Sequence, residues 1–291
     1  MITETLPSRA SLWKPFTQQY FMLFFFSLTQ TQFNYSLGRA RAIRSLRSKA
    51  TSQQIQMAAS DYKQALVLSS REDWVTIEDK LEDGAKTNPY ATWEYGMALR
   101  RNSQYEEAKS IHLLASDLFD NISDRPRSVI SLLDAGVDAA CQEAATGSTI
   151  KSGIGEDDAK NLLRKGVKYT TTAESRDVAL LQRVVAKEGE GRIVLAALEW
   201  TDPEGKSLRQ DAESQLSVAC ERLDQLEQDA LQRGRNGAAS TSYTELRFNI
   251  DDYPGALETS CSRLKNNREF QERLEWPKIL QEKTQKLAKL K

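Results

Sequence analysis

The stretch Tyr90 to Phe119, YATWEYGMALRRNSQYEEAKSIHLLASDLF, has the residue spacing that decides the fold. Side chains in its first half recur at helical intervals, namely Tyr95, Gly96 and Leu99. Asn102 and Ser103 then interrupt the pattern. The second half recurs at three- and four-residue steps, through Tyr105, Ala108, Ile111, His112 and Ala115. We therefore predict two short antiparallel helices, which their small side chains allow to cross closely.

This spacing resembles one tetratricopeptide (TPR) repeat, a two-helix unit that stacks into a solenoid. The positions that match the family's motif are Gly96, Tyr105, Ala108 and Ala115. The chain departs from the motif at His112, where an aromatic residue is usual, and at Asp120, where a proline often ends the repeat. The resemblance covers roughly a tenth of the chain. It implies an all-α fold of stacked helix pairs, because one pair alone cannot bury its apolar face.

Related patterns extend from this stretch in both directions. Residues 54–69 and 72–87 predict another helix pair, with Gly84 as its small residue and Asn88-Pro89 as a helix stop. After Pro126, a further apolar stripe includes Val129, Ile130, Leu133, Val137 and Cys141. Residues 145–155 are rich in glycine and serine and predict a loop. The sequence thus predicts a TPR-like antiparallel helix-pair solenoid over residues 54–145.

A helical continuation is predicted over residues 156–233. Its helices are expected at 156–168, 174–187, 191–200 and 206–232, with breaks at 169–172 and at 189–191. Leucines and alanines in the long helix 206–232 alternate steps of four and three, close to a coiled-coil seam. Such a seam docks either on neighbouring helices of the same chain or on a second copy, and the sequence favours the first.

The last predicted region is a C-terminal helical segment, residues 243–291, that ends in a basic amphipathic tail. The final fourteen residues hold five lysines and one glutamate beside Ile279, Leu280, Leu287 and Leu290. This composition suits peripheral contact with an acidic partner or an anionic lipid surface. A solvated terminal helix is the alternative.

The first fifty residues have the composition of a targeting segment. No acidic residue occurs between Thr5 and Ser60, and the apolar run Tyr20 to Leu28 is too short to cross a bilayer core. The order of basic start, apolar run and Arg- and Ser-rich stretch resembles a bipartite plastid presequence. In such a presequence a signal peptide precedes a transit segment that often begins with an aromatic residue, which here would be Phe33. A mitochondrial presequence and a disordered basic tail are the alternatives. We expect residues 1–50 to lie outside the folded domain.

Charge and cysteine usage narrow the classes of partner. The chain holds 40 basic and 41 acidic residues, so its overall field does not favour nucleic acid. From Asp61 onward the balance is 33 basic to 40 acidic, which also argues against RNA binding by a basic groove. Cys141, Cys220 and Cys261 lie far apart within helical patterns. We predict three buried free thiols in a reducing compartment.

Residue sets that support catalysis are incomplete in this sequence. His112 is the only histidine and lies at an inward helical position, so we expect it to pack rather than to serve as a general base. Gly205-Lys206-Ser207 resembles the end of a phosphate-binding loop, but Trp200 stands where the earlier glycine belongs. Asp251-Asp252 precedes Tyr253-Pro254 and predicts a turn. We therefore expect no catalytic residues, no cofactor and no metal site.

A partner-binding surface is predicted on the first helix of the central pair. If Tyr95, Gly96 and Leu99 face inward, the opposite side of that helix would line the concave groove of a TPR-like stack. The residues on that side are Tyr90, Trp93, Met97, Arg100 and Arg101. Aromatic, methionine and arginine side chains suit capture of an apolar or acidic protein segment. The alternative is that the preceding helix covers them.

These observations predict a non-catalytic scaffold, assembly factor or accessory subunit of an organellar complex. A plastid location is favoured. One candidate complex in that location is a photosynthetic membrane assembly, which is implied only by the resemblance of the N-terminus to a plastid presequence. The alternatives are a mitochondrial respiratory or ribosomal accessory subunit, and an enzyme of unknown type. Protein subunits are the expected partners.

Overall fold

A computed structural model describes residues 51–69, 89–146, 158–200, 208–235 and 258–290. Most residues within these ranges are helical, and no strand occurs among them. The longer helices are α2 (Ser52–Ser69), α3 (Pro89–Arg101), α4 (Tyr105–Asn121), α5 (Arg125–Thr146), α6 (Ala159–Tyr169), α7 (Val178–Trp200) and α8 (Leu208–Arg235). The short helices are η2 (Thr170–Thr172), α10 (Cys261–Asn266), α11 (Arg268–Arg273), α12 (Lys278–Gln285) and η4 (Lys286–Lys289). The predicted all-α class is confirmed for these parts of the chain.

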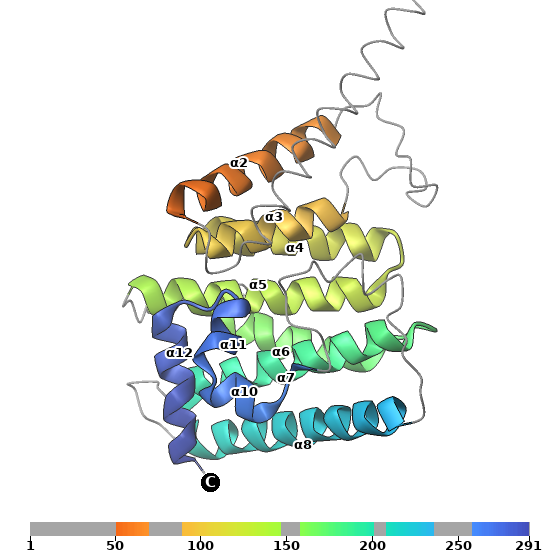
Figure 1. Cartoon of the computed structure of the whole chain (residues 1–291), viewed down its shortest axis with the longest axis vertical. Coiled ribbons are helices and arrows are strands. Elements are labelled where there is room, and N and C mark those ends of the chain that lie inside the picture. The colour runs from red at the N-terminus through yellow and green to blue at the C-terminus, as the bar shows by residue number, and fades with distance from the viewer. Residues whose placement is uncertain (1–50, 70–88, 147–157, 201–207, 236–257, 291) are drawn as a thin grey trace, which may run out of the picture.

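The helices form successive layers. In Figure 1 the order runs from α2 at one end, through α3 with α4 and then α5, to α6 with α7 and finally α8. Each helix packs on the next one in the chain, and α5 also packs directly on α7. The C-terminal helices lie against one side of this stack, where α12 runs across the other helices and contacts α5 and α7 (Figure 1).

Three pairs of consecutive helices close on a glycine. In each pair, one helix places a glycine against a large side chain of the other, as ridges-into-grooves packing at short interaxial distance requires. The pairs are Gly96 of α3 with His112 of α4, Gly136 of α5 with Leu163 of α6, and Gly189 of α7 with Leu223 of α8. A methyl group added at any of these glycines would come within 3.0 Å of the facing side chain. Glycine therefore sets how closely each pair packs.

Helix α7 corrects one prediction. Residues 189–191 were expected to separate two helices, but α7 continues through them from Val178 to Trp200. Gly189 packs against Leu223, and a Cβ at Gly191 would lie 2.8 Å from Leu133. The two glycines cost helix propensity but permit close packing on both sides of α7. Tertiary contacts thus outweigh the local signal for a break.

Several other predicted boundaries agree with the structure. Helix α2 occupies the first predicted helix at 54–69, whereas its partner at 72–87 lies outside the described residues. Asp158 caps α6 by accepting a 2.7 Å hydrogen bond from the backbone N–H of Asn161. The long helix 206–232 is α8, whose seam docks on α7 of the same chain. The buried seam residues are Ala212, Leu216, Ala219, Leu223 and Leu226.

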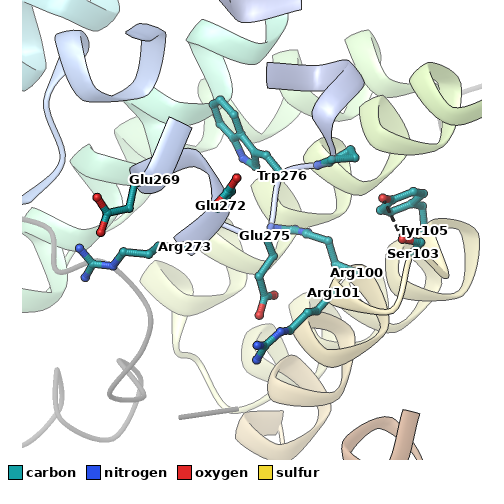
Figure 2. Close-up of a pocket in the computed structure, with 10 residues that line it drawn as sticks. Arg100, Arg101, Ser103, Tyr105, Glu269, Glu272, Arg273, Glu275 and Trp276 are labelled. Atoms are coloured by element: carbon teal, nitrogen blue, oxygen red, sulfur yellow. Dashed lines mark hydrogen bonds between the residues drawn. The ribbon is translucent and has the colours of Figure 1, made fainter. Parts of the chain in front are cut away.

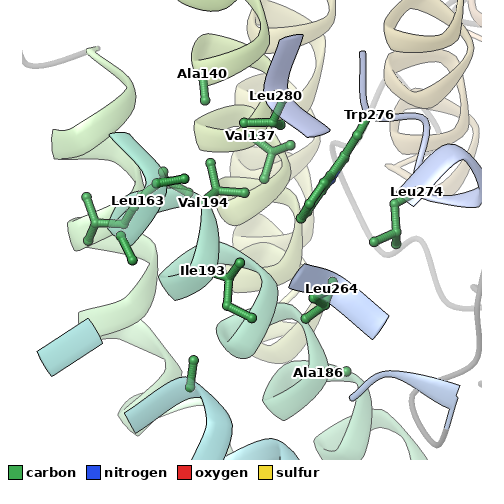
Figure 3. Close-up of a cluster of buried hydrophobic side chains, with 14 of the residues drawn as sticks. Val137, Ala140, Leu163, Ala186, Ile193, Val194, Leu264, Leu274, Trp276 and Leu280 are labelled. Carbon is green, nitrogen blue, oxygen red and sulfur yellow. The ribbon is translucent and has the colours of Figure 1, made fainter. Parts of the chain in front are cut away.

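The C-terminal segment, defined here as residues 258–290, is part of the core. Figure 3 shows Leu264, Trp276 and Leu280 from this segment beside Val137 of α5 and Val194 of α7. Two further leucines of the basic tail, Leu287 and Leu290, are also buried. The apolar side of the tail is therefore used within the chain, which leaves Lys278, Lys286 and the exposed Ile279 for the surface. Across the described parts of the chain, no helix is long and apolar enough to cross a membrane.

Cysteine pairing also differs from the prediction of three free thiols. Cys220 of α8 and Cys261 at the start of α10 form a disulfide, with Cα atoms 4.9 Å apart and a sequence separation of 41. Cys141 of α5 is free and buried, as expected. Sequence spacing could not reveal the disulfide, because the two cysteines meet only once the C-terminal segment folds back on α8.

Three helices end in a Schellman motif that lacks glycine. Ser103, Ser123 and Glu275 have φ near +60° and occupy the position after the helix cap where glycine is usual. At the end of α4, the Asp124 N–H bonds to the Phe119 carbonyl and the Ser123 N–H bonds to the Asp120 carbonyl. A side chain at such a position costs free energy that glycine avoids.

Replacing Ser123 with glycine is expected to stabilise the protein by about 0.5–1 kcal/mol, because glycine relieves the left-handed conformation. Chemical denaturation of Ser123→Gly against the native protein measures the difference. The matched control is Ser110→Gly in the middle of α4, at an exposed position, which should destabilise by a similar amount. A destabilised Ser123→Gly would contradict the assignment of this motif.

Candidate functional site: a buried charge network and an adjacent pocket

Two carboxylates on α5 organise the polar interior. Asp134 and Asp138 are four residues apart, so they project from the same face of the helix. Both side chains are fully buried. Their partners come from three other helices: Trp93 and Arg100 of α3, His112 of α4 and Lys187 of α7. We call these six residues, together with Glu190, the charge network.

Asp134 accepts hydrogen bonds from three side chains. Trp93 Nε1 donates at 2.8 Å, Arg100 Nη2 at 3.1 Å and Lys187 Nζ at 2.6 Å. Burial alone would raise the pKa of Asp134, but the charges of Lys187 and Arg100 outweigh it and hold that pKa well below its usual range. The carboxylate therefore stays ionised in the interior, where it neutralises cations from α3 and α7.

Asp138 accepts from the remaining two donors. Arg100 Nε and His112 Nδ1 each lie 2.5 Å from one of its oxygens. Because a carboxylate can only accept, the Nδ1 atom of His112 carries the proton of this hydrogen bond. The other edge of the His112 ring faces Gly96, where a Cβ would lie 2.5 Å from the ring. The predicted inward position of His112 is confirmed, and the ring is fixed from both sides.

Glu190 extends the network to the C-terminal segment. Its carboxylate lies 2.8 Å from Lys187 Nζ, one helical turn earlier on α7, and accepts a 3.0 Å hydrogen bond from Trp276 Nε1. Trp276 is only 3% exposed, so this hydrogen bond is shielded from water. The polar contacts therefore run without interruption from α3 and α4 through α5 and α7 to the C-terminal segment.

The network makes the relative placement of these helices specific. Separating two helices would leave a charged group buried without its partner, which costs several kcal/mol. Apolar contacts in the same core tolerate small shifts, because they have no preferred direction. Buried polar groups with directional bonds instead fix the helix register. The structure therefore couples α3, α4, α5, α7 and the C-terminal segment into one unit.

Cys141 lies one turn after Asp138 on α5, and its burial makes the stability of the protein depend on pH. Burial raises the pKa of its thiol, so the folded protein keeps it neutral at pH values where the unfolded chain ionises it. Its contribution to stability is complete below the unfolded pKa, near 8.5, and is lost as the pH rises above that value.

Between pH 8 and pH 9.5, we expect this ionisation to remove about 1 kcal/mol of stability. Cys141→Ala should lack that loss, so its stability should fall less steeply over the same range. Urea denaturation of both proteins at four pH values measures the difference in slope. Parallel pH profiles would show that the thiol is not excluded from water.

A surface pocket lies beside the charge network. Its volume is about 330 Å³, within the lower part of the range for small-ligand sites. One wall is the end of α3 and the turn into α4, and the other is α11 with its connection to α12 (Figure 2). The lining residues are Arg100, Arg101, Ser103, Tyr105, Glu269, Glu272, Arg273, Glu275, Trp276 and Pro277. Segments about 170 residues apart in sequence thus form one pocket.

Three glutamates and three arginines line the pocket, but two of these arginines pair with carboxylates outside the lining, which leaves the acidic groups in excess. Of the glutamates, Glu269 and Glu272 are exposed. Of the three arginines, Arg100 is neutralised by the carboxylates of α5, and Arg273 pairs with Glu258 at 2.7 Å. Figure 2 shows that Arg101 and Glu275 belong to opposite walls of the pocket. This balance favours a ligand that brings basic groups.

The predicted partner-binding residues do not line an open groove. Trp93, Met97 and Arg100 are at most 1% exposed, because α3 is covered by α2 on one side and by α4 and α5 on others. Tyr90 is partly buried and packs edge-on against Phe119, with the ring centroids 5.3 Å apart. Arg101 is the member of the predicted set that reaches the surface pocket without belonging to the charge network. A partner could contact the three buried residues only if the helices separated.

Sequence reasoning missed the acidic half of the network. Asp134 and Asp138 lie within the apolar stripe of 126–145, and two aspartates four residues apart on a buried helix were the available signal. Lys187 and Glu190, charged residues of opposite sign three positions apart in the sequence, gave a second signal. The pocket gave none, because its walls are distant in sequence.

Among the described residues, no group of three or more histidine, cysteine, aspartate or glutamate side chains is arranged to hold a metal ion.

Comparison with known proteins finds no matching family model, no matching curated protein and no matching solved structure.

Proposed function

We propose that this chain is a non-catalytic scaffold or accessory subunit of a larger protein complex, built as a TPR-like helix-pair solenoid with a C-terminal helical extension. The observation that carries the proposal is the charge network, in which buried ionisable groups bind one another and fix five segments in place. A rigid body of this kind suits the presentation of partner surfaces in a constant geometry. The helix pairs that each pack closely at a glycine support the comparison with helix-pair repeats.

The pocket is the proposed partner site. Both of its walls are anchored by the charge network, through Arg100 on one side and Trp276 on the other. Its acidic excess fits a basic segment of a partner subunit, and Arg101 and Tyr105 add a donor and an aromatic edge. We retain the plastid as the proposed location, with the mitochondrion as the alternative. Both rest on the composition of residues 1–50, which lie outside the described residues.

Copurification from the native organelle tests the proposal. The tagged full-length chain should bring down stoichiometric partner subunits, and the double variant Glu269→Lys/Glu272→Lys should lose them. The matched control is Glu221→Lys/Asp224→Lys on α8, which reverses two exposed acidic residues at the same three-residue spacing. Circular dichroism confirms that both variants are folded.

Equal loss in both variants would show that overall charge, not the pocket, determines partner binding. Turnover of a small substrate by the purified protein, abolished by a point change that spares folding, would overturn the non-catalytic assignment.

A further inference from the structure

We propose that the Cys220–Cys261 disulfide is a redox clasp that regulates how firmly the C-terminal segment docks on the helix stack. Its effect on partner binding rests on the proposed function, because the regulated segment supplies one wall of the pocket. The reduced protein would hold that wall less firmly than the oxidised protein.

The location of the disulfide suits such a role. Cys220 lies on α8, which is at one end of the stack (Figure 1), and the residue is only partly buried, so a redox partner can approach it from that end. Cys261 is the first residue of α10 and is buried. The disulfide therefore fastens the beginning of the C-terminal segment covalently to a helix that the pocket does not include.

Non-covalent contacts hold the rest of the segment. Leu264 and Leu280 are fully buried in the shared core, and Trp276 donates its hydrogen bond to Glu190. Reduction of the disulfide removes none of these contacts, so the segment remains docked on average. It does remove the closed loop between two cysteines with a sequence separation of 41, which makes the undocked state less restricted and therefore more populated.

The pocket responds because of where its residues lie along the segment. Glu269 and Glu272 lie on α11, the helix that directly follows α10 with its Cys261, and Trp276 comes next. Undocking of the segment would remove the acidic wall from Arg101 and would also withdraw Trp276 from Glu190. One covalent bond thus influences both the pocket and one end of the charge network.

The chemistry is thiol–disulfide exchange with a dithiol reductant. A thiolate of the reductant attacks the Cys220 sulfur, which forms a mixed disulfide and releases the Cys261 sulfur as a thiolate that takes up a proton. The second thiol of the reductant then attacks the mixed disulfide, releases Cys220 as a thiol and leaves the reductant as a disulfide. Two electrons and two protons pass to the protein in total. A disulfide oxidant drives the reverse reaction.

Hydrogen–deuterium exchange of the purified full-length protein tests the clasp. In oxidised buffer, mass spectrometry should find Cys220 and Cys261 protected from alkylation and joined in one peptide pair. After dithiothreitol, amides of residues 261–285 should exchange faster by on the order of tenfold to a hundredfold. Amides of α6 serve as the internal reference and should be unchanged.

The variants separate the clasp from a general effect of reductant. Cys220→Ser/Cys261→Ser should exchange fast in both buffers, whereas Cys141→Ala should respond to dithiothreitol as the native protein does. Free Cys220 and Cys261 in oxidised buffer, or equal exchange before and after reduction, would overturn the clasp. If reduction speeds the exchange but the reduced protein retains its partner subunits as well as the oxidised protein does, the clasp is supported and the pocket is overturned as the partner site.

Discussion

Asp134→Asn is expected to lower the free energy of unfolding by about 3–5 kcal/mol, because it removes the charge of a buried carboxylate that pairs with two cations and accepts three side-chain hydrogen bonds. Lys187 lies 2.6 Å from this carboxylate, and Arg100 lies 3.1 Å from it. Asparagine keeps the size of the side chain and one carbonyl acceptor, so the loss reports on charge rather than on packing. Urea denaturation monitored by circular dichroism measures the change.

The control for this variant is Asp120→Asn. Asp120 forms an ion pair with Arg125 at 2.9 Å, but its side chain is 52% exposed. Exposed pairs contribute about 1 kcal/mol or less, so this variant should be nearly neutral. Because Asp134 and Lys187 contact each other, the double variant Asp134→Asn/Lys187→Met should lose less stability than the sum of the two single variants. Equal effects of Asp134→Asn and Asp120→Asn would show that the network contributes no more than a surface ion pair.

The central helix pair could be predicted from the sequence because its signals are local. Helix α3 ends at Arg101 and α4 begins at Tyr105, on either side of the predicted break at Asn102 and Ser103. Side chains three and four residues apart determine these helices, and the chain reversal needs only the turn residues between them. Such information lies within a window of about 30 residues.

The functional surface could not be predicted in the same way. An amphipathic interpretation assigns one side of α3 to solvent, but α3 is buried on all sides. Trp93 and Arg100 find their acceptors on α5, 34 to 41 residues further along the chain. The pocket depends on a still more distant segment that includes Glu272. Pairings of this kind follow from the tertiary fold, which residue spacing alone does not determine.

Gly96→Ala is expected to destabilise the protein by about 2–3 kcal/mol, although alanine is the better helix former by about 1 kcal/mol. The added Cβ would lie 2.5 Å from Cδ2 and Nε2 of His112. This ring cannot turn away without breaking the hydrogen bond between its Nδ1 atom and Asp138. The clash would therefore move α3 relative to α4 or disrupt the charge network.

Gly191→Ala is the matched comparison, because its Cβ would meet Cδ2 of Leu133 at 2.8 Å and its three nearest neighbours are all leucine side-chain atoms. The contacting atoms are the end of a leucine side chain that can change rotamer, so this variant should lose less stability than Gly96→Ala. Combining Gly96→Ala with His112→Ala should cost less than the sum of the two single variants, since the ring that clashes is gone. Thermal and urea denaturation of the four proteins give this coupling energy. Strict additivity of Gly96→Ala and His112→Ala would show that the histidine ring does not set the distance between α3 and α4.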